Sequence, residues 1–213
     1  MARVQAVISD FGGVLSSPLI GSFAAFTEFS GVSLEALGHA MAAVALARGS
    51  NPLFELETGR IGEAEFLGAL GEQLTGQLGR PIDMDGFGER YFANLEPNHD
   101  VIGYMRALRG RGYKLAICTN NVREWEPLWR AMVPVEEIFE VVVDSAFVGV
   151  RKPEPEIYEM TLDRLGVEAA AALLVDDVEI NCDAARALGM RAVHFRTSEQ
   201  AIEETEAALR ETA

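Results

Sequence analysis

Four groups of polar residues, far apart in the chain, have types that could together transfer a phosphoryl group or hold a cation. A carboxylate can act as a nucleophile, and paired carboxylates can bind a hard cation such as Mg²⁺. Hydroxyl and ammonium groups can stabilise charge on an anionic substrate. Each group follows a predicted strand. The four groups are Asp10, Thr119-Asn120, Lys152 in the loop 149–155, and Asp176-Asp177.

Asp10 follows the apolar run at residues 6–8, which is typical of a buried strand. Gly12 and Gly13 come shortly after it, and glycine allows a sharp turn close to a ligand. In open α/β sheets, ligands bind beyond the carboxyl ends of the strands. The pattern therefore favours a ligand site at Asp10, although it also fits an aspartate that only caps the next helix.

The other groups also have simpler structural interpretations when each is taken alone. Thr119-Asn120 is typical of a turn or a helix cap, and Lys152 could be a solvated loop lysine. Asp176 or Asp177 could cap the helix that follows. Capping needs only one carboxylate, however, and two adjacent acids at a buried strand end repel each other unless a cation lies between them.

Apolar periodicity divides the chain into a helical stretch and an alternating stretch. Between residues 18 and 95 the pattern predicts about four short helices, including one capped by Ser33 and one over residues 61–74. From residue 98 onward, strands alternate with helices. The predicted strands are 114–118, 141–143, 172–175 and 192–195, and the predicted helices are 101–108, 122–132, 156–165, 180–188 and 199–210.

This order predicts an α/β fold: a Rossmann-like parallel sheet core with helices on both faces and an inserted helical-bundle cap. Residues 1–16 and 96–213 would form the α/β core domain, and residues 17–95 the helical cap domain. Several residues are expected to serve packing. They are Phe23, Phe26, Phe29, Trp125 and Trp129, together with Cys118 and Cys182 as reduced, buried thiols.

Composition limits the classes of partner. The 213 residues carry a net charge of −15, from 18 Lys and Arg against 33 Asp and Glu. This acidity opposes binding to nucleic acid, which needs a basic face, and to anionic membrane surfaces. No N-terminal run is long enough for a signal peptide or a membrane span, so the cytoplasm is the expected location. An anionic substrate would be repelled unless a cation or local basic residues reverse the field.

In their order and spacing, the four groups resemble the motifs of the haloacid dehalogenase superfamily of hydrolases, most of which are phosphatases. The resemblance spans the whole chain. It is to the subgroup with a helical cap between the first and second motifs, as in the phosphatase domain of soluble epoxide hydrolases. The segments that carry it are DFGGVL at 10–15, CTNN at 118–121, GVRKPEPEIY at 149–158 and LLVDDVEIN at 173–181.

The resemblance implies a Mg²⁺-dependent phosphatase that acts on a small-molecule phosphate ester, for example a sugar phosphate. Asp10 would be the nucleophile and form an aspartyl-phosphate, Thr119 would bind a phosphoryl oxygen, and Lys152 would neutralise nucleophile and phosphate. The implied metal ligands are Asp10, the Gly12 carbonyl and Asp177, with Asp176 beside them. The implied substrate-binding residues are Asn120, Gly12 and Gly13.

One position departs from the family pattern. Superfamily phosphatases usually carry a second aspartate two residues after the nucleophile, as the general acid for the leaving group, and this chain has Gly12 there. A positioned acid is worth about 10²–10⁴-fold in rate. We therefore expect slow turnover of alkyl phosphates and smaller losses for good leaving groups, such as anomeric sugar phosphates or aryl phosphates.

Two alternatives stay open. A 2-haloacid dehalogenase would also use Asp10, but such enzymes usually replace the paired acids with Ser and Asn, whereas Asp176 and Asp177 are intact. A non-catalytic phosphometabolite-binding protein would explain the missing acid at Gly12. A receiver domain is rejected because its acid pair comes first in the chain. The sequence does not specify the physiological substrate, the cap residues that select it, or whether the protein is a monomer or a homodimer.

Overall fold

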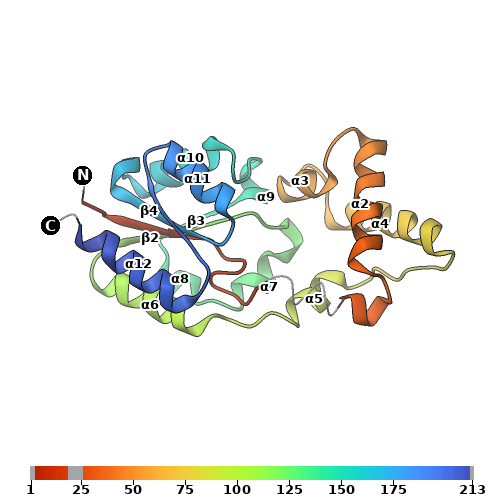
Figure 1. The fold of residues 1–213 in the computed structure, drawn as a ribbon, viewed down its shortest axis with the longest axis horizontal. Helices are drawn as coiled ribbons and strands as arrows, with labels where there is room; N and C mark the ends of the chain where they lie inside the picture. Colours follow the sequence, from red (N-terminus) through yellow and green to blue (C-terminus); the bar gives the residue numbers. More distant parts are fainter. Residues whose placement is uncertain (1–2, 19–25, 212–213) are drawn as a thin grey trace.

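Five parallel strands form the central sheet of the computed structural model, which describes residues 3–18 and 26–211 (Figure 1). Their order in the sheet is β3-β2-β1-β4-β5, so β1 lies between β2 and β4. The predicted α/β fold with a Rossmann-like parallel sheet is confirmed. The strands are β1 (Ala6–Ser9), β2 (Lys114–Thr119), β3 (Val141–Asp144), β4 (Ala172–Asp176) and β5 (Arg191–His194).

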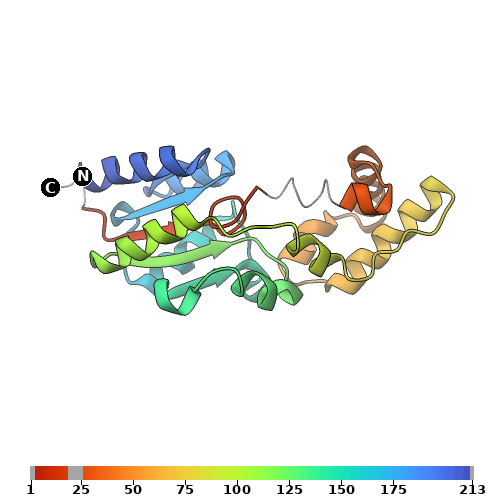
Figure 2. The ribbon, with the colours of Figure 1, turned by 90° about the horizontal axis from the view of Figure 1, so that it is seen from below.

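Helices cover both faces of the sheet (Figures 1 and 2). Alternate strand residues point to opposite faces, so Val7 and Leu115 pack on one side against α6, α7, α8 and α12. Ile8 and Ala116 pack on the other side against α10 and α11. The bounds of these helices are α6 (His99–Gly110), α7 (Glu126–Arg130), α8 (Val135–Ile138), α10 (Pro155–Leu165), α11 (Glu179–Ala187) and α12 (Ser198–Arg210).

Several helices begin at a capping residue that the sequence displays. Ser33 caps its helix, since its side chain accepts a hydrogen bond from the amide of Ala36 at 3.1 Å. The predicted helix over residues 122–132 is wrong as one element, because Pro127 lacks an N–H and lies in the first turn of a new helix that begins at Glu126. The segment consists of the 3-10 helix η1 (Arg123–Trp125) and α7. Two four-residue helices, α8 and α9 (Ser145–Val148), are too short to show a periodic pattern.

Between β1 and α6 the chain forms a group of helices that we call the helical insertion. It lies beyond the carboxyl ends of the strands (Figures 1 and 2). Leu70, Leu74 and Phe87 form its core together with Phe26, and Phe23 lies outside the described residues. The insertion contains the helical residues 26–30 and helices α2 (Leu34–Arg48), α3 (Pro52–Glu57), α4 (Glu63–Leu78) and α5 (Phe87–Phe92).

Trp125 joins the insertion to the α/β part of the molecule. Its ring stacks on Tyr91 with centroids 5.1 Å apart, and its Nε1 donates a hydrogen bond to Glu63 Oε1 at 2.8 Å. Trp129 is instead fully buried beside the sheet, in contact with Phe11. Trp129 therefore serves packing, as the sequence predicted, whereas Trp125 lies at the junction of the two parts.

Two further observations concern sequence expectations. Cys118 and Cys182 are buried free thiols. Among the described residues, none of the helices combines the length and apolar character that a membrane span requires.

Candidate active site

The predicted site residues meet at the carboxyl edge of the sheet. The chain winds from β1 toward β3 on one side and toward β5 on the other, so the order reverses between β1 and β4. A crevice at such a reversal is where open α/β sheets bind ligands. Asp10 follows β1, Thr119 ends β2 and Asp176 ends β4. The Asp10 amide donates to the Val175 carbonyl at 2.9 Å, which extends the pairing of β1 with β4 to the site.

Lys152 lies at the centre of this group. Its side chain is only 1% exposed, and its Nζ lies 2.9 Å from Asp10 Oδ1 and 2.7 Å from Asp176 Oδ2. The Phe11 amide also donates to Asp10 Oδ1, at 2.7 Å. Asp10 Oδ2 accepts no hydrogen bond in the described part of the chain. One oxygen of Asp10 is thus held in place while the other stays free.

Asp176 orients its neighbours. Besides Lys152, it accepts hydrogen bonds at Oδ1 from the Val178 amide at 2.9 Å and from Asn181 Nδ2 at 3.0 Å. Both carboxylate oxygens are therefore engaged, and the side chain is fully buried. Asp176 fixes the position of Lys152 and the start of α11.

Asn120 binds the backbone of the Lys152 loop. The resemblance implied that Asn120 also contacts substrate, and the residue lines the cavity beside the site. Asn120 Nδ2 donates to the Lys152 carbonyl at 2.9 Å, and Oδ1 accepts from the Lys152 amide at 2.8 Å. These two hydrogen bonds hold the loop of Lys152 against the end of β2. Thr119 Oγ1, by contrast, has no hydrogen-bond partner within residues 3–18 and 26–211.

Asp177 and Gly13 lie in close contact. A Cβ atom on Gly13 would come within 2.4 Å of Asp177 Oδ2, and Gly13 has φ of +72°. Both features require glycine there. One carboxylate oxygen each of Asp10, Asp176 and Asp177 lies within 4.8 Å of the others. Because a divalent cation prefers oxygen ligands, this donor set fits a hard metal ion.

Burial and neighbouring charges shift the pKa values of Asp10, Asp177 and Lys152. Burial raises the pKa of Asp10 to about 7, Lys152 opposes this shift, and Asp176 and Asp177 add to it. Burial and Asp176 also raise the pKa of Asp177. Burial lowers the pKa of Lys152, but Asp10 and Asp176 outweigh it, so the net shift is upward. Lys152 carries one positive charge, and the cluster around it contains three carboxyl groups.

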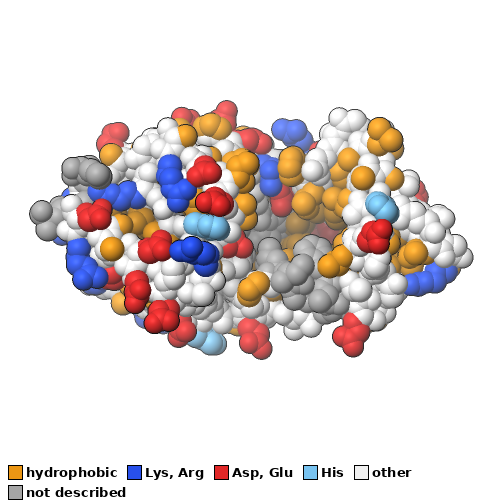
Figure 3. All heavy atoms as spheres, in the orientation of Figure 1, with side chains coloured by type: hydrophobic (Ala, Val, Ile, Leu, Met, Phe, Trp, Pro, Cys, Tyr) orange, Lys and Arg blue, Asp and Glu red, His pale blue; other side chains and the backbone are white. Residues whose placement is uncertain are grey.

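A cavity of about 200 Å³ opens beside this cluster. One end is formed by Gly12, Thr119 and Asn120 of the α/β part. The rest is formed mainly by the insertion, including Leu53 and Glu57 of α3. The space-filling view shows the hollow between the two parts, with hydrophobic side chains on its walls (Figure 3).

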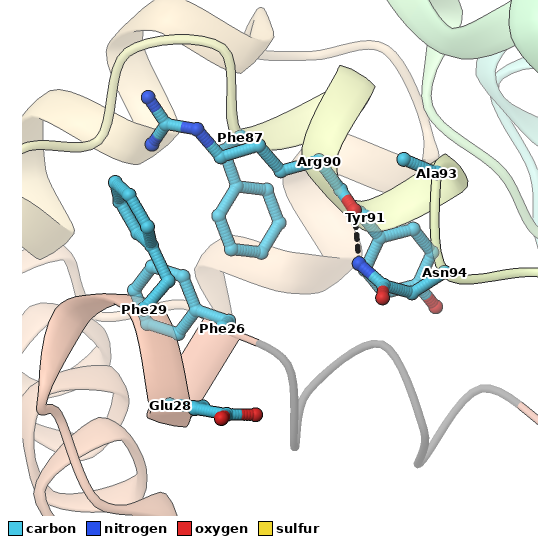
Figure 4. Close-up of a pocket in the computed structure, with 8 residues that line it drawn as sticks. All are labelled: Phe26, Glu28, Phe29, Phe87, Arg90, Tyr91, Ala93 and Asn94. Atoms are coloured by element: carbon cyan, nitrogen blue, oxygen red, sulfur yellow. Dashed lines mark hydrogen bonds between the residues drawn. The ribbon is translucent and has the colours of Figure 1, made fainter.

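A larger cavity of about 410 Å³ lies within the insertion (Figure 4). Phe26, Phe29 and Phe87 line it, and the Arg90 guanidinium lies 4.2 Å from the Phe29 ring centroid. It contains none of the predicted catalytic residues. Tyr91 lines both cavities.

Sequence reasoning missed the ion pair between Glu57 and Arg151. Arg151 Nε lies 2.6 Å from Glu57 Oε2, and both side chains are largely buried. Burial raises the pKa of Glu57, whereas Arg151 lowers it. The two residues are 94 positions apart, so spacing gives no signal. The only available hint was that Arg151 precedes Lys152 in its motif.

The motifs, the fold and the arrangement of the site agree with those of the haloacid dehalogenase-like hydrolases. The sequence model of the haloacid dehalogenase-like hydrolases matches residues 4–189. The chain therefore belongs to this family, and it is a hydrolase.

Its relatives include phosphatases. The glyceraldehyde 3-phosphate phosphatase of Pyrococcus abyssi is 38% identical over 92 residues, which are 42% of this chain and 38% of that protein. The matched segment thus spans well under half of that relative. A sesquiterpene phosphatase of Aspergillus oryzae is 28% identical over 204 residues, 91% of each chain.

Solved structures share the fold. A haloacid dehalogenase family enzyme of Bacteroides thetaiotaomicron, in complex with magnesium and inorganic phosphate, aligns with a TM-score of 0.71 at 20% identity. The alignment covers 91% of this chain and 94% of that one.

Proposed function

We propose that this hydrolase is a Mg²⁺-dependent phosphatase of a small phosphorylated metabolite, and that Asp10 forms an aspartyl-phosphate during turnover. The observation that carries the proposal is the placement of Lys152, whose Nζ contacts both Asp10 and Asp176. An ammonium group there can neutralise the nucleophile and the incoming phosphate. The phosphatases among the relatives support the same reaction class.

The residues present fit a magnesium ion. The carboxylates of Asp10 and Asp177 and the carbonyl of Gly12 would hold it, because the oxygens of Asp176 are already engaged. Gly13 leaves the space that the Asp177 carboxylate occupies. When bound, Mg²⁺ would neutralise charge on the carboxylates and the phosphate and so favour their approach. The Bacteroides enzyme binds magnesium together with inorganic phosphate, which is consistent with this choice of metal.

The chain's own residues account for two steps. The Asp10 carboxylate attacks phosphorus while the ester P–O bond breaks, and the organic group leaves as an alkoxide or phenoxide. Water then attacks phosphorus, releases phosphate and returns Asp10 to its carboxylate form. Thr119 donates its hydroxyl to a phosphoryl oxygen, and Lys152 stabilises the negative charge in both steps. Gly12 offers no proton to the leaving group. Esters whose alkoxide or phenoxide leaving group is weakly basic should therefore react fastest.

The helical insertion would act as a cap over the site. The two segments that join it to the α/β part lie side by side, since the Ser17 amide donates to the Glu96 carbonyl at 2.8 Å. Ser16 and Pro97 form an isolated antiparallel bridge. This pairing supports a cap domain of residues 17–95, of which 19–25 lie outside the described part, and a core domain of 1–16 and 96–213.

A direct assay tests the proposal. Purified protein should release phosphate from p-nitrophenyl phosphate with Mg²⁺, and both EDTA and the variant Asp10→Asn should abolish the release. Chloride release from 2-chloropropionate would instead favour the dehalogenase. Tight phosphate-ester binding without product would favour the non-catalytic alternative.

A further inference from the structure

The cavity beside the catalytic residues has one polar end and mainly apolar walls. Gly12, Thr119 and Asn120 form the polar end. The walls include the side chains of Leu53 and Leu95. Phosphate would occupy the polar end, next to Asp10 and Lys152, so the walls face the organic group of the ester.

Two polar side chains of these walls, Trp125 and Glu57, already have partners. The indole Nε1 of Trp125 donates to Glu63 at 2.8 Å. Glu57 is the one charged residue among the described residues that line the cavity, and Arg151 lies 2.6 Å from its Oε2. The hydroxyls of a sugar would therefore lose their hydrogen bonds to water and gain few in return, which costs binding free energy.

We propose that the substrate is a phosphate monoester with an apolar, preferably aromatic, organic group, an inference that rests on the proposed phosphatase function. Leu53 supports it directly, because this leucine keeps 36% of its surface exposed while it lines the cavity. An apolar group bound there would remove that surface from water.

Aromatic side chains make an aryl group the best fit. The Trp125 ring stacks on Tyr91 at 5.1 Å and meets Phe92 edge-on at 5.6 Å. All three residues line the cavity, and aromatic rings prefer such neighbours. A phenoxide also leaves without a proton donor more readily than an alkoxide, which suits the glycine at position 12.

The test compares two substrates with matched chemistry and different polarity. Hexyl phosphate and glucose 6-phosphate are both six-carbon primary alkyl esters, but only the second carries hydroxyls. We expect kcat/KM to be at least about tenfold higher for hexyl phosphate. If both turn over too slowly, their inhibition constants against p-nitrophenyl phosphate give the same comparison.

Two variants connect this preference to the cavity wall. Leu53→Asn should lower the ratio of hexyl phosphate to glucose 6-phosphate by about threefold or more, because it replaces an apolar wall with an amide. Leu78→Asn is the matched control, since Leu78 is 38% exposed on another helix of the insertion and does not line the cavity. It should leave the ratio unchanged.

The outcomes separate the two proposals. Absence of Mg²⁺-dependent turnover of p-nitrophenyl phosphate would contradict the phosphatase function itself. Turnover of p-nitrophenyl phosphate together with an equal or better use of glucose 6-phosphate would overturn only the apolar substrate. An equal effect of Leu53→Asn and Leu78→Asn on the ratio would also overturn it.

Discussion

At the scale of single residues, the site depends on an imbalance of charge. Three carboxylates converge, from Asp10, Asp176 and Asp177, and Lys152 is the cation in contact with two of them. Buried like charges are costly unless they are neutralised. A divalent ion would restore the balance and leave the site able to accept an anion.

This imbalance predicts a pH-dependent effect of Mg²⁺ on stability. The pKa of Asp10 is about 7 in the folded protein, above its ordinary value of 3.8. Because the folded-state pKa is raised, this group favours folding below about pH 4, and its contribution is lost as the pH rises to about 7. Mg²⁺ competes with protons for the carboxylates, so saturating Mg²⁺ should raise the melting temperature more at pH 8 than at pH 5.5. An equal or smaller rise at pH 8, measured by calorimetry, would contradict this view of the cluster.

Gly13 offers a second prediction with a matched control. Gly13→Ala should raise the Mg²⁺ concentration needed for half-maximal activity by about tenfold or more, because the added methyl group displaces the Asp177 carboxylate. Gly49 also has φ of +72°, but nothing lies within 4 Å of its Cβ position. Gly49→Ala should therefore meet the same backbone strain, without a steric clash, and leave the Mg²⁺ dependence unchanged. A similar shift of the Mg²⁺ requirement in both variants would rule out displacement of Asp177 as the cause.

At the scale of helices and strands, much of the site could be predicted from the sequence. Asp10, Thr119 and Asp176 follow from strand ends, because parallel strands place their carboxyl ends at one edge. Lys152 comes from a loop after a strand, so its contact with Asp10 and Asp176 was indicated mainly by the motif resemblance. The engagement of Asn120 with the Lys152 backbone could not be predicted, since both a helix cap and a ligand contact fit the same residue type.

The contact between the insertion and the site was also beyond sequence reasoning. Apolar periodicity identifies helices such as α2 and α4, but it does not say which face turns toward the sheet. Glu57 and Arg151 meet only through tertiary packing, and the walls of the cavity are set in the same way. The proposed substrate preference therefore rests on the structure and not on the sequence.

A double-mutant cycle tests the ion pair that joins α3 to the loop of Lys152. Arg151→Ala leaves the largely buried Glu57 charge unpaired beside the cavity, so kcat/KM should fall by about tenfold through repulsion of the phosphate ester. Glu57→Gln in the same chain removes that charge and should restore part of the loss. A double variant no better than Arg151→Ala would show that the charge of Glu57 is not the cause.

At the scale of the whole molecule, the net charge of −15 opposes the approach of an anionic ester. Cations within the site can offset this repulsion only at short range. Added salt screens repulsion between charges that lie farther apart than the Debye length, which is about 10 Å at 0.1 M ionic strength. We therefore expect kcat/KM for p-nitrophenyl phosphate to rise, roughly twofold, between 10 and 200 mM KCl at fixed Mg²⁺. A steady fall across that range would show that the approaching ester experiences a positive field.

The central claim is that the carboxylate of Asp10 takes the phosphoryl group. An acid-quenched single turnover, followed by mass spectrometry of the peptide that contains Asp10, tests it most directly. We expect a phosphorylated Asp10 in the wild-type protein with Mg²⁺, and none in Asp10→Asn or after EDTA. Phosphate release at an undiminished rate from Asp10→Asn, with no phosphorylated peptide from either protein, would contradict it.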